Sequence, residues 1–139
     1  MKKKFLLLIV LLFGVVFYII ARENNRKVPA NIVFIGDSIM HSSKKYIAPN
    51  FENPYFDTKI GRQFSTLPGI VSKLKEQDGI KTALVVHLGT NGKFKEEDFD
   101  YVVEMADGKD IFIINTVHKD PWEKEVNQLL AEKVEQYRQ

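Results

Sequence analysis

A chain of 139 residues with 45% hydrophobic and 27% charged residues has the size and composition of one globular domain. It contains no cysteine, which excludes disulfides, thiolate catalysis and cysteine-based metal sites. The net charge is +2, but Lys2, Lys3 and Lys4 account for three positive charges, so residues 22–139 carry a net charge of −1. The composition therefore offers no indication of a nucleic-acid-binding surface.

Residues 1–21 predict an N-terminal membrane anchor. An uninterrupted apolar run of 17 residues, 5–21, would span about 25 Å as a helix, near the lower limit for crossing a bilayer. The alternative is a cleaved secretory signal, but such signals usually have a shorter apolar core of about 7 to 15 residues. We favour an uncleaved single-pass anchor followed by a polar tether at residues 22–30. The lysines before the run would keep the N-terminus in the cytoplasm and place the remainder outside the cell, whereas signal cleavage would release it as a secreted domain.

Residues 31–40, NIVFIGDSIM, contain the first candidate site. The apolar run at 32–35 ends in Gly36, Asp37 and Ser38, as a buried parallel strand does where it enters a tight loop. Gly36 would let the backbone turn sharply, and Asp37 would hold the loop through its side chain. Because ligands bind outside the carboxyl ends of parallel strands, the Ser38 hydroxyl is placed for chemistry. A Gly-Asp-Ser turn by itself is common and does not establish catalysis.

The following segments alternate between strand-like and helix-like patterns. Residues 39–54 are irregular and predict a long loop over the mouth of the site, with room for one helical turn. Apolar and β-branched runs predict further strands at 55–60, 82–88 and 110–117. Apolar residues at helical spacing predict helices at 68–77 and 96–106.

The last helix has the clearest start signal. Asp120 can cap it, Pro121 occupies the first helical position, and Glu123 stands three residues after the cap, as in a capping box. Its apolar stripe, which we expect to pack on the core, consists of Trp122, Val126, Leu129, Leu130, Val134 and Tyr137.

This order of elements predicts an α/β fold, a three-layer α/β/α flavodoxin-like parallel sheet in one domain at residues 31–139. Right-handed crossovers would place alternate helices on opposite sides of the sheet.

Three glycine-bearing strand ends should meet at one edge of this sheet: GDSIM at 36–40, GRQ at 61–63 and GTNG at 89–92. Their order, together with the motifs IGRQ, HLGTNG, NT and PWE, resembles the SGNH (GDSL-type) hydrolase superfamily. These motifs are most similar to those of the extracellular SGNH domains of peptidoglycan and polysaccharide O-acetyltransferases. The resemblance covers about residues 31–139 and implies an acyl-ester enzyme, either an O-acetyltransferase or an acetylesterase, that acts on cell-envelope polysaccharide.

The resemblance also implies roles for individual residues. Ser38 would be the nucleophile. The backbone N–H groups of Ser38 and Gly61 and the side-chain amide of Asn91 would form the oxyanion hole, with Gly36 and Asp37 as loop support. Such preorganised donors can stabilise a tetrahedral oxyanion by several kcal/mol. We expect no cofactor and no metal, since no two histidines or carboxylates show ligand spacing.

One departure from the family concerns the general base. Family members carry a late Asp-x-x-His block after a fifth strand, and this sequence shows four predicted strands and no such block. A serine hydroxyl is a weak nucleophile without an adjacent base. His118, next to Asp120 and on the same sheet edge as Ser38, is the candidate surrogate. We interpret His41 as a solvated loop residue and His87 as a structural hydrogen-bonding residue.

Two explanations for the absent block stay open. The reading frame could be shortened, or the chain could be a pseudoenzyme that binds an envelope glycan or a partner. Related transferases are often fused to a multipass membrane acyl-donor domain, so an active transferase of this length would need such a protein as a partner.

Overall fold

The computed structural model describes residues 32–138. The predicted anchor and tether, at residues 1–30, lie outside these residues. None of the helices between residues 32 and 138 combines the length and apolarity that crossing a membrane requires.

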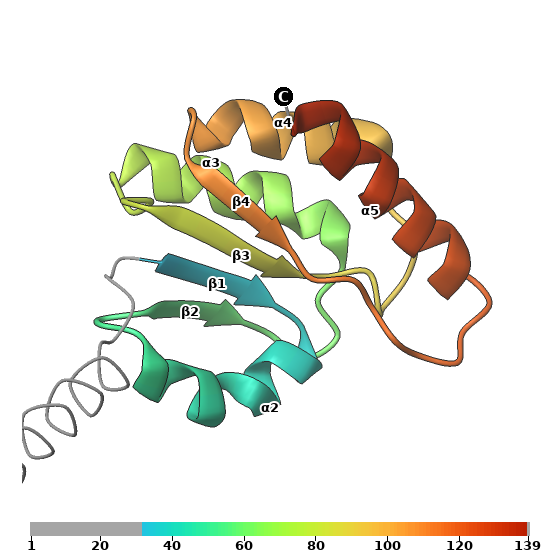
Figure 1. The fold of residues 1–139 in the computed structure, drawn as a ribbon, viewed down its shortest axis with the longest axis horizontal. Coiled ribbons are helices and arrows are strands. Elements are labelled where there is room, and N and C mark those ends of the chain that lie inside the picture. The colour runs from blue at the N-terminus through green and yellow to red at the C-terminus, as the bar shows by residue number, and fades with distance from the viewer. Residues whose placement is uncertain (1–31, 139) are drawn as a thin grey trace, which may run out of the picture.

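Four parallel strands form one sheet in the order β2-β1-β3-β4 (Figure 1). Their bounds are Ile32–Gly36 for β1, Tyr55–Thr58 for β2, Ala83–His87 for β3 and Asp110–Ile113 for β4. Gly36 pairs in register with Thr58 on one side and with His87 on the other, so β1, β2 and β3 end at the same level. The loops after these three strands therefore meet at one edge of the sheet, as predicted.

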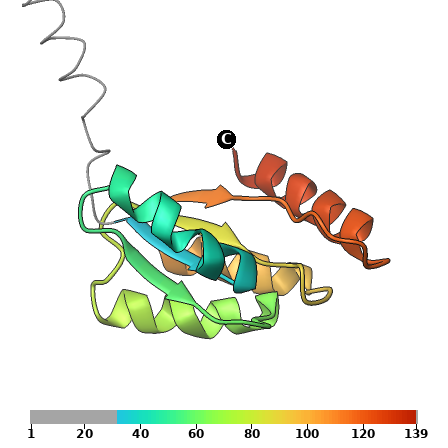
Figure 2. The same ribbon diagram turned by 90° about the horizontal axis from the view of Figure 1, so that it is seen from below.

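The helices cover both faces of the sheet, as the expected α/β architecture requires. Helix α2 (Ser38–Ile47) packs on one face, and α3 (Leu67–Glu76) and α4 (Glu96–Ala106) pack together on the other (Figures 1 and 2). The prediction that successive helices alternate between faces was wrong. The chain moves outward from β1 to β2 and then reverses through β3 to β4, so right-handed crossovers put α3 and α4 on the same face.

The core is divided by the sheet. The larger part includes the side chains Val33, Ile35, Phe64, Leu67, Val71, Leu84, Val86, Phe99, Val102, Val126 and Leu130. The smaller part, between β1 and α2, is built around Ile32, Phe34, Met40 and Ala83. The period of two in β1, with Val33 and Ile35 on one face and Ile32 and Phe34 on the other, explains why this strand is buried throughout.

The segment that follows Ser38 is helical, and the prediction of a long loop there was wrong. Helix α2 extends to Ile47, and a 3₁₀ turn, η1 (Ala48–Asn50), continues it. Asp37 caps the helix, and Met40 and Ile47 pack on the sheet. Serine and lysine residues on the outer side of α2 hid this face in the sequence, because only contact with β1 and β2 makes the helix stable.

The C-terminal part departs from the predictions in two respects. Strand β4 ends at Ile113, before the predicted end at residue 117, and is partly exposed, although an apolar run of this kind is typical of a buried strand. Helix α5 (Glu123–Tyr137) begins at Glu123, later than predicted, and has no capping box. The Glu123 carboxylate accepts the backbone N–H of His118 (2.9 Å) and does not cap Asp120, because the preceding turn directs it toward that loop.

Candidate active site

Ser38 is the first residue of α2 and directly follows the loop after β1. Its side chain is half-buried, whereas Asp37 beside it is fully buried. Asp37 is the N-cap of the helix, and its Oδ1 accepts the backbone N–H of Ile39 (2.9 Å). The Ser38 N–H lies in the first turn, where helix N–H groups have no intrahelical acceptor and the helix dipole is positive. This end of α2 can therefore stabilise a negative charge beside the Ser38 hydroxyl.

The Asp37 carboxylate is the centre of a buried polar network. The Asn91 amide donates to Asp37 Oδ2 (3.4 Å), which joins the loop after β3 to the loop after β1. His87, also buried, brings its Nδ1 to 3.3 Å from Asp37 Oδ1, but the approach is not aligned as a hydrogen bond. The predicted supporting role of Asp37 thus has a clear geometry: it holds both the α2 N-terminus and Asn91.

Asn91 extends this network to the loop after β2. Its amide nitrogen also donates to the carbonyl oxygen of Arg62 (3.1 Å), the residue after Gly61. Gly61 has a φ of +73°, a conformation that L side chains rarely adopt, and this requirement explains the glycine. Both amide hydrogens of Asn91 are therefore engaged, so an oxyanion would compete with its longer hydrogen bond, the one to Asp37.

Sequence reasoning assigned no role to Arg62, although it stands in the GRQ segment. Its guanidinium contacts Asp57 of β2 through both the carboxylate (2.5 Å) and the carbonyl oxygen (2.6 Å). These bonds hold the loop that carries Gly61. The signal was its place next to a strand-end glycine, but its acidic partner could be identified only from the structure.

Gly36 has a different structural reason from the one predicted. Its φ lies outside the left-handed region, so no sharp turn requires glycine there. A Cβ at this position would lie 2.2 Å from Met40 Cβ and 3.2 Å from the His87 carbonyl oxygen. Glycine is needed because α2 packs directly against the end of β1.

His118 lies in the loop between β4 and α5. Its Nδ1 accepts the backbone N–H of Asp120 (3.1 Å) and lies 3.2 Å from the Asp120 carboxylate, while Nε2 is buried without a hydrogen-bond partner. Trp122 packs near the His118 ring and donates its indole N–H to the Thr90 carbonyl oxygen (3.4 Å). The His118 loop is therefore attached to the loop that carries Asn91.

This geometry limits how His118 could act as a base. A neutral ring that accepts the Asp120 N–H at Nδ1 carries its proton on Nε2, whereas a base that takes a proton at Nε2 must carry its own on Nδ1. The Asp120 carboxylate could accept such an Nδ1 proton after a small shift. In the part of the chain that the structure describes, no hydrogen bond joins Ser38 to His118, so the role of His118 stays a prediction.

The third histidine, His41, is exposed on α2. Its Nδ1 lies 3.0 Å from the Thr58 hydroxyl, which connects α2 to β2. It is thus a helical residue with a partner and not the solvated loop residue that we expected.

Comparison with known proteins agrees with this arrangement. No family model matches the chain. It is 28% identical over 99 residues, 71% of its length, to peptidoglycan O-acetyltransferase OatA of Listeria monocytogenes. It is 29% identical over 101 residues, 73% of its length, to YrhL of Bacillus subtilis, which carries the provisional name of peptidoglycan O-acetyltransferase. The chain spans only 16% of each of these relatives.

The fold has a counterpart among solved structures. The C-terminal catalytic domain of Streptococcus pneumoniae peptidoglycan O-acetyltransferase A, solved with a methylsulfonyl adduct, matches with a TM-score of 0.59 and 15% identity. The match covers 77% of this chain and 60% of that one. The chain is thus similar to peptidoglycan O-acetyltransferases in sequence and to the catalytic domain of one of them in fold. The resemblance inferred from the GDSIM, GRQ and GTNG segments is thereby confirmed.

Proposed function

We propose that this SGNH domain transfers acetyl groups to hydroxyls of a cell-envelope polysaccharide through Ser38. The observation that carries the proposal is the Asp37–Asn91–Arg62 network, which fixes three strand-end loops around the Ser38 end of α2. The Ser38 oxygen would attack the donor ester and release the donor alcohol. A sugar hydroxyl would then take the acetyl group from Ser38 and regenerate the serine. Transfer to water would make the same domain an esterase.

Deprotonation of Ser38 requires a base, and we assign this role to His118. The buried Nε2 of His118 has no hydrogen-bond partner among residues 32–138, and the Asp120 carboxylate, 3.2 Å from Nδ1, would orient and stabilise the charged ring. The role requires the tautomer with the proton on Nδ1. It also predicts that His118→Ala and Ser38→Ala abolish the same activity.

We further propose that residues 1–21 anchor the chain in the membrane and that the SGNH domain lies outside the cell. An acetyl donor in that location would have to be delivered across the bilayer, so transfer requires a multipass membrane protein as a partner. The names of the similar proteins support a peptidoglycan acceptor.

Labelling with a serine-directed fluorophosphonate tests the nucleophile. The full chain in membranes should gain one adduct by intact-mass spectrometry, and Ser38→Ala should gain none. Ser42→Ala is the matched control, because Ser42 is an exposed serine on the same helix and should not affect labelling. Absence of an adduct in the unmodified chain would contradict an activated Ser38.

A non-catalytic glycan-binding or partner-binding domain is the second candidate. The observation that favours it is that no described histidine is hydrogen-bonded to Ser38. Saturable binding of a peptidoglycan fragment that is unchanged in Ser38→Ala, together with no labelling, would favour this function. Release of acetate from a simple acetate ester, lost in Ser38→Ala, would favour the enzyme.

A further inference from the structure

A groove follows strand β2 and begins at the candidate active site. It consists of two adjoining hollows of about 430 and 350 Å³, which share Thr66 and Ile70 in their linings. The loop after β2 lines the first hollow with Lys59, Gly61, Arg62 and Gln63. The second hollow continues between β2 and α3 as far as Tyr55 and Gln77. We call the two hollows together the β2–α3 groove.

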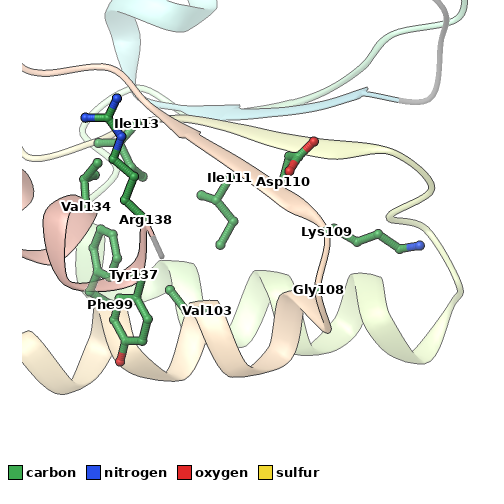
Figure 3. Close-up of a pocket in the computed structure, with 10 residues that line it drawn as sticks. All are labelled: Phe99, Val103, Gly108, Lys109, Asp110, Ile111, Ile113, Val134, Tyr137 and Arg138. Atoms are coloured by element: carbon green, nitrogen blue, oxygen red, sulfur yellow. The ribbon is translucent and has the colours of Figure 1, made fainter.

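The β2–α3 groove is distinct from the larger hollow that Figure 3 shows. That hollow, of about 510 Å³, lies between β4, α4 and α5, at the other edge of the sheet. Its lining residues all lie within residues 99–138 and include neither Ser38, Gly61 nor Asn91. The β2–α3 groove instead reaches Gly61, whose N–H is a proposed oxyanion donor. A molecule bound along this groove would therefore extend from the reacting ester toward the start of β2.

The two walls of the groove present side chains at regular intervals. On β2, Tyr55 and Asp57 are two residues apart and share the face on which α3 packs. The opposite wall consists of residues at helical spacing: Thr66, Gly69, Ile70, Lys73 and Gln77. At 1.5 Å per residue, this wall is roughly 16 Å long, which exceeds the length of one sugar ring. The groove can therefore hold a short chain.

Gly69 leaves open space in the α3 wall. Glycine is less favourable than alanine in a helix, so its presence usually has a local reason. A Cβ at position 69 would have nothing within 4 Å, and the φ of Gly69 lies outside the left-handed region. Within residues 32–138, neither packing nor backbone conformation therefore requires glycine here. A ligand that occupies the groove would explain it.

The groove carries two unpaired positive charges. Asp57 and Arg62 neutralise each other through their ion pair (2.5 Å). Lys59 and Lys73 also line the groove, are exposed, and form no ion pair within residues 32–138. The other charged residues of α3 have opposite signs and line neither hollow: Lys75 and Glu76. The groove therefore favours a ligand with negative charges.

The uncharged lining residues suit a sugar chain. Tyr55 is 54% exposed at the end of the groove that is remote from Ser38. An aromatic ring of this kind can pack against the apolar face of a sugar. The Gln63 and Gln77 amides and the Thr66 hydroxyl can exchange hydrogen bonds with sugar hydroxyl and acetamido groups.

We propose that the β2–α3 groove binds the sugars of an acidic glycan strand that flank the sugar at Ser38. This inference rests on the proposed transfer to an envelope polysaccharide and adds where the strand lies on the domain. Lys59 and Lys73 pair with carboxylates of the strand, and Tyr55 packs against a ring at its far end. A strand held at several points keeps one sugar hydroxyl oriented toward Ser38, which favours transfer to that hydroxyl.

Binding of two glycans to the full chain in detergent tests the charge assignment. Peptidoglycan strands without their stem peptides carry a carboxylate in every disaccharide, whereas chitin oligosaccharides of equal length have a similar backbone without charge. The acidic strands should bind about tenfold more tightly at low salt, and Lys59→Glu combined with Lys73→Glu should remove this preference. Lys109→Glu is the matched control, because Lys109 is an exposed lysine at the other sheet edge. Equal binding of the two glycans would overturn the proposal.

Filling the groove provides a second measurement. Gly69→Phe places a ring in the open space and should weaken binding of the acidic strands about tenfold. Gly69→Ala removes the same glycine but adds only a methyl group, so it should bind almost as well. Unchanged affinity in Gly69→Phe would overturn the proposal.

Cysteine protection locates the bound strand, since the natural chain contains no cysteine. The acidic strands should slow maleimide modification of Gln77→Cys, at the far end of the groove, severalfold. Glu104→Cys is the control, because Glu104 is exposed on α4 and does not line the groove. No protection of Gln77→Cys would overturn the proposal, as would protection that requires the stem peptides, which would indicate a peptide ligand.

Fluorophosphonate labelling of Ser38 is read separately from these measurements. Labelling without glycan binding in the groove would refute the groove alone. Glycan binding in the groove without labelling would refute the proposed activity alone.

Discussion

Asp37 and Lys133 are both buried charged residues, but the structure stabilises them in different ways. Asp37 lies at the strand ends, and its partners are the Ile39 N–H, the Asn91 amide and the nearby His87 ring. Lys133 lies on α5 and donates to both carboxylate oxygens of Asp100 on α4 (2.8 and 3.0 Å). No lysine or arginine is paired with Asp37 within residues 32–138, whereas Lys133 has a direct counter-ion.

The difference separates a site from a structural contact. An N–H of α2 and the Asn91 amide stabilise the Asp37 charge, whereas the Ser38 N–H of the same turn has no intrahelical acceptor and can donate to a negative charge beside Ser38. On α5, the hydrogen bond from Lys133 lowers the pKa of Asp100, and the same bond raises the pKa of Lys133. This pair connects α4 to α5 and leaves no charge for a ligand. Substitution of Asp37 should therefore affect both stability and Ser38 labelling, whereas substitution of Lys133 should affect stability without affecting labelling.

The largest effect is expected from Asp37→Ala. The substitution removes the N-cap and leaves Asn91 with an unpaired donor, which should lower the free energy of unfolding by about 3 kcal/mol. It should also abolish labelling of Ser38. Asp37→Asn keeps an acceptor oxygen and should be less destabilising in denaturant unfolding. Unchanged stability of Asp37→Ala would show that the network does not hold the loops.

Gly36→Ala should have the next largest effect on stability. The added Cβ would collide with Met40 and push α2 off the sheet, at a cost of about 2 kcal/mol of the free energy of unfolding. Gly61→Ala is the comparison, because a Cβ there has nothing within 4 Å and only the positive φ is unfavourable. We expect about 1 kcal/mol for it. Equal losses in thermal unfolding would contradict the packing explanation for Gly36.

Lys133→Met should have a smaller effect on stability and none on Ser38 labelling. The variant leaves Asp100 partly exposed to water, so the lost ion pair is replaced by hydration. Hydrogen exchange should be faster in α5 and unchanged in α2. Lys133→Arg, which keeps the charge, should restore much of the protection, and equally faster exchange in α2 would argue against a local role.

The smallest expected effect is the acid dependence of the same contact. The folded-state pKa of Asp100 is lowered, so its contribution to stability is present above the unfolded value of about 3.9 and is lost as pH falls through the folded value. Exchange in α5 should therefore increase below about pH 4 in the natural chain. Lys133→Met should show a smaller additional increase, because the Tyr137 hydroxyl still donates to Asp100, and an identical acid profile in both proteins would contradict the assignment.

Much of the candidate site could be predicted from short segments. Gly36, Gly61 and Asn91 follow strand-like runs, and the carboxyl ends of parallel strands share an edge, so their proximity followed from the order of the elements. The hydrogen-bonding and ionic partners in the site could not be predicted from the order of the elements. His87 at the end of β3 lies beside Asp37 after β1, and such a pair depends on strand register, which a single sequence does not reveal. Arg62 contacts Asp57 within the turn that follows β2, and this contact depends on how that loop folds back on its own strand.

The sequence by itself determined the succession of strands along the chain and the loops at the strand ends. It also determined helix 96–106, whose bounds the structure reproduces. These features follow from local periodicity, glycine positions and capping residues, which act over a few neighbours. Only the tertiary structure decided that α2 is a helix, that β4 is an exposed edge and that Lys133 is buried. Each of these depends on contacts between segments far apart in the chain, and burial is a property of the packed surface, not of the local pattern.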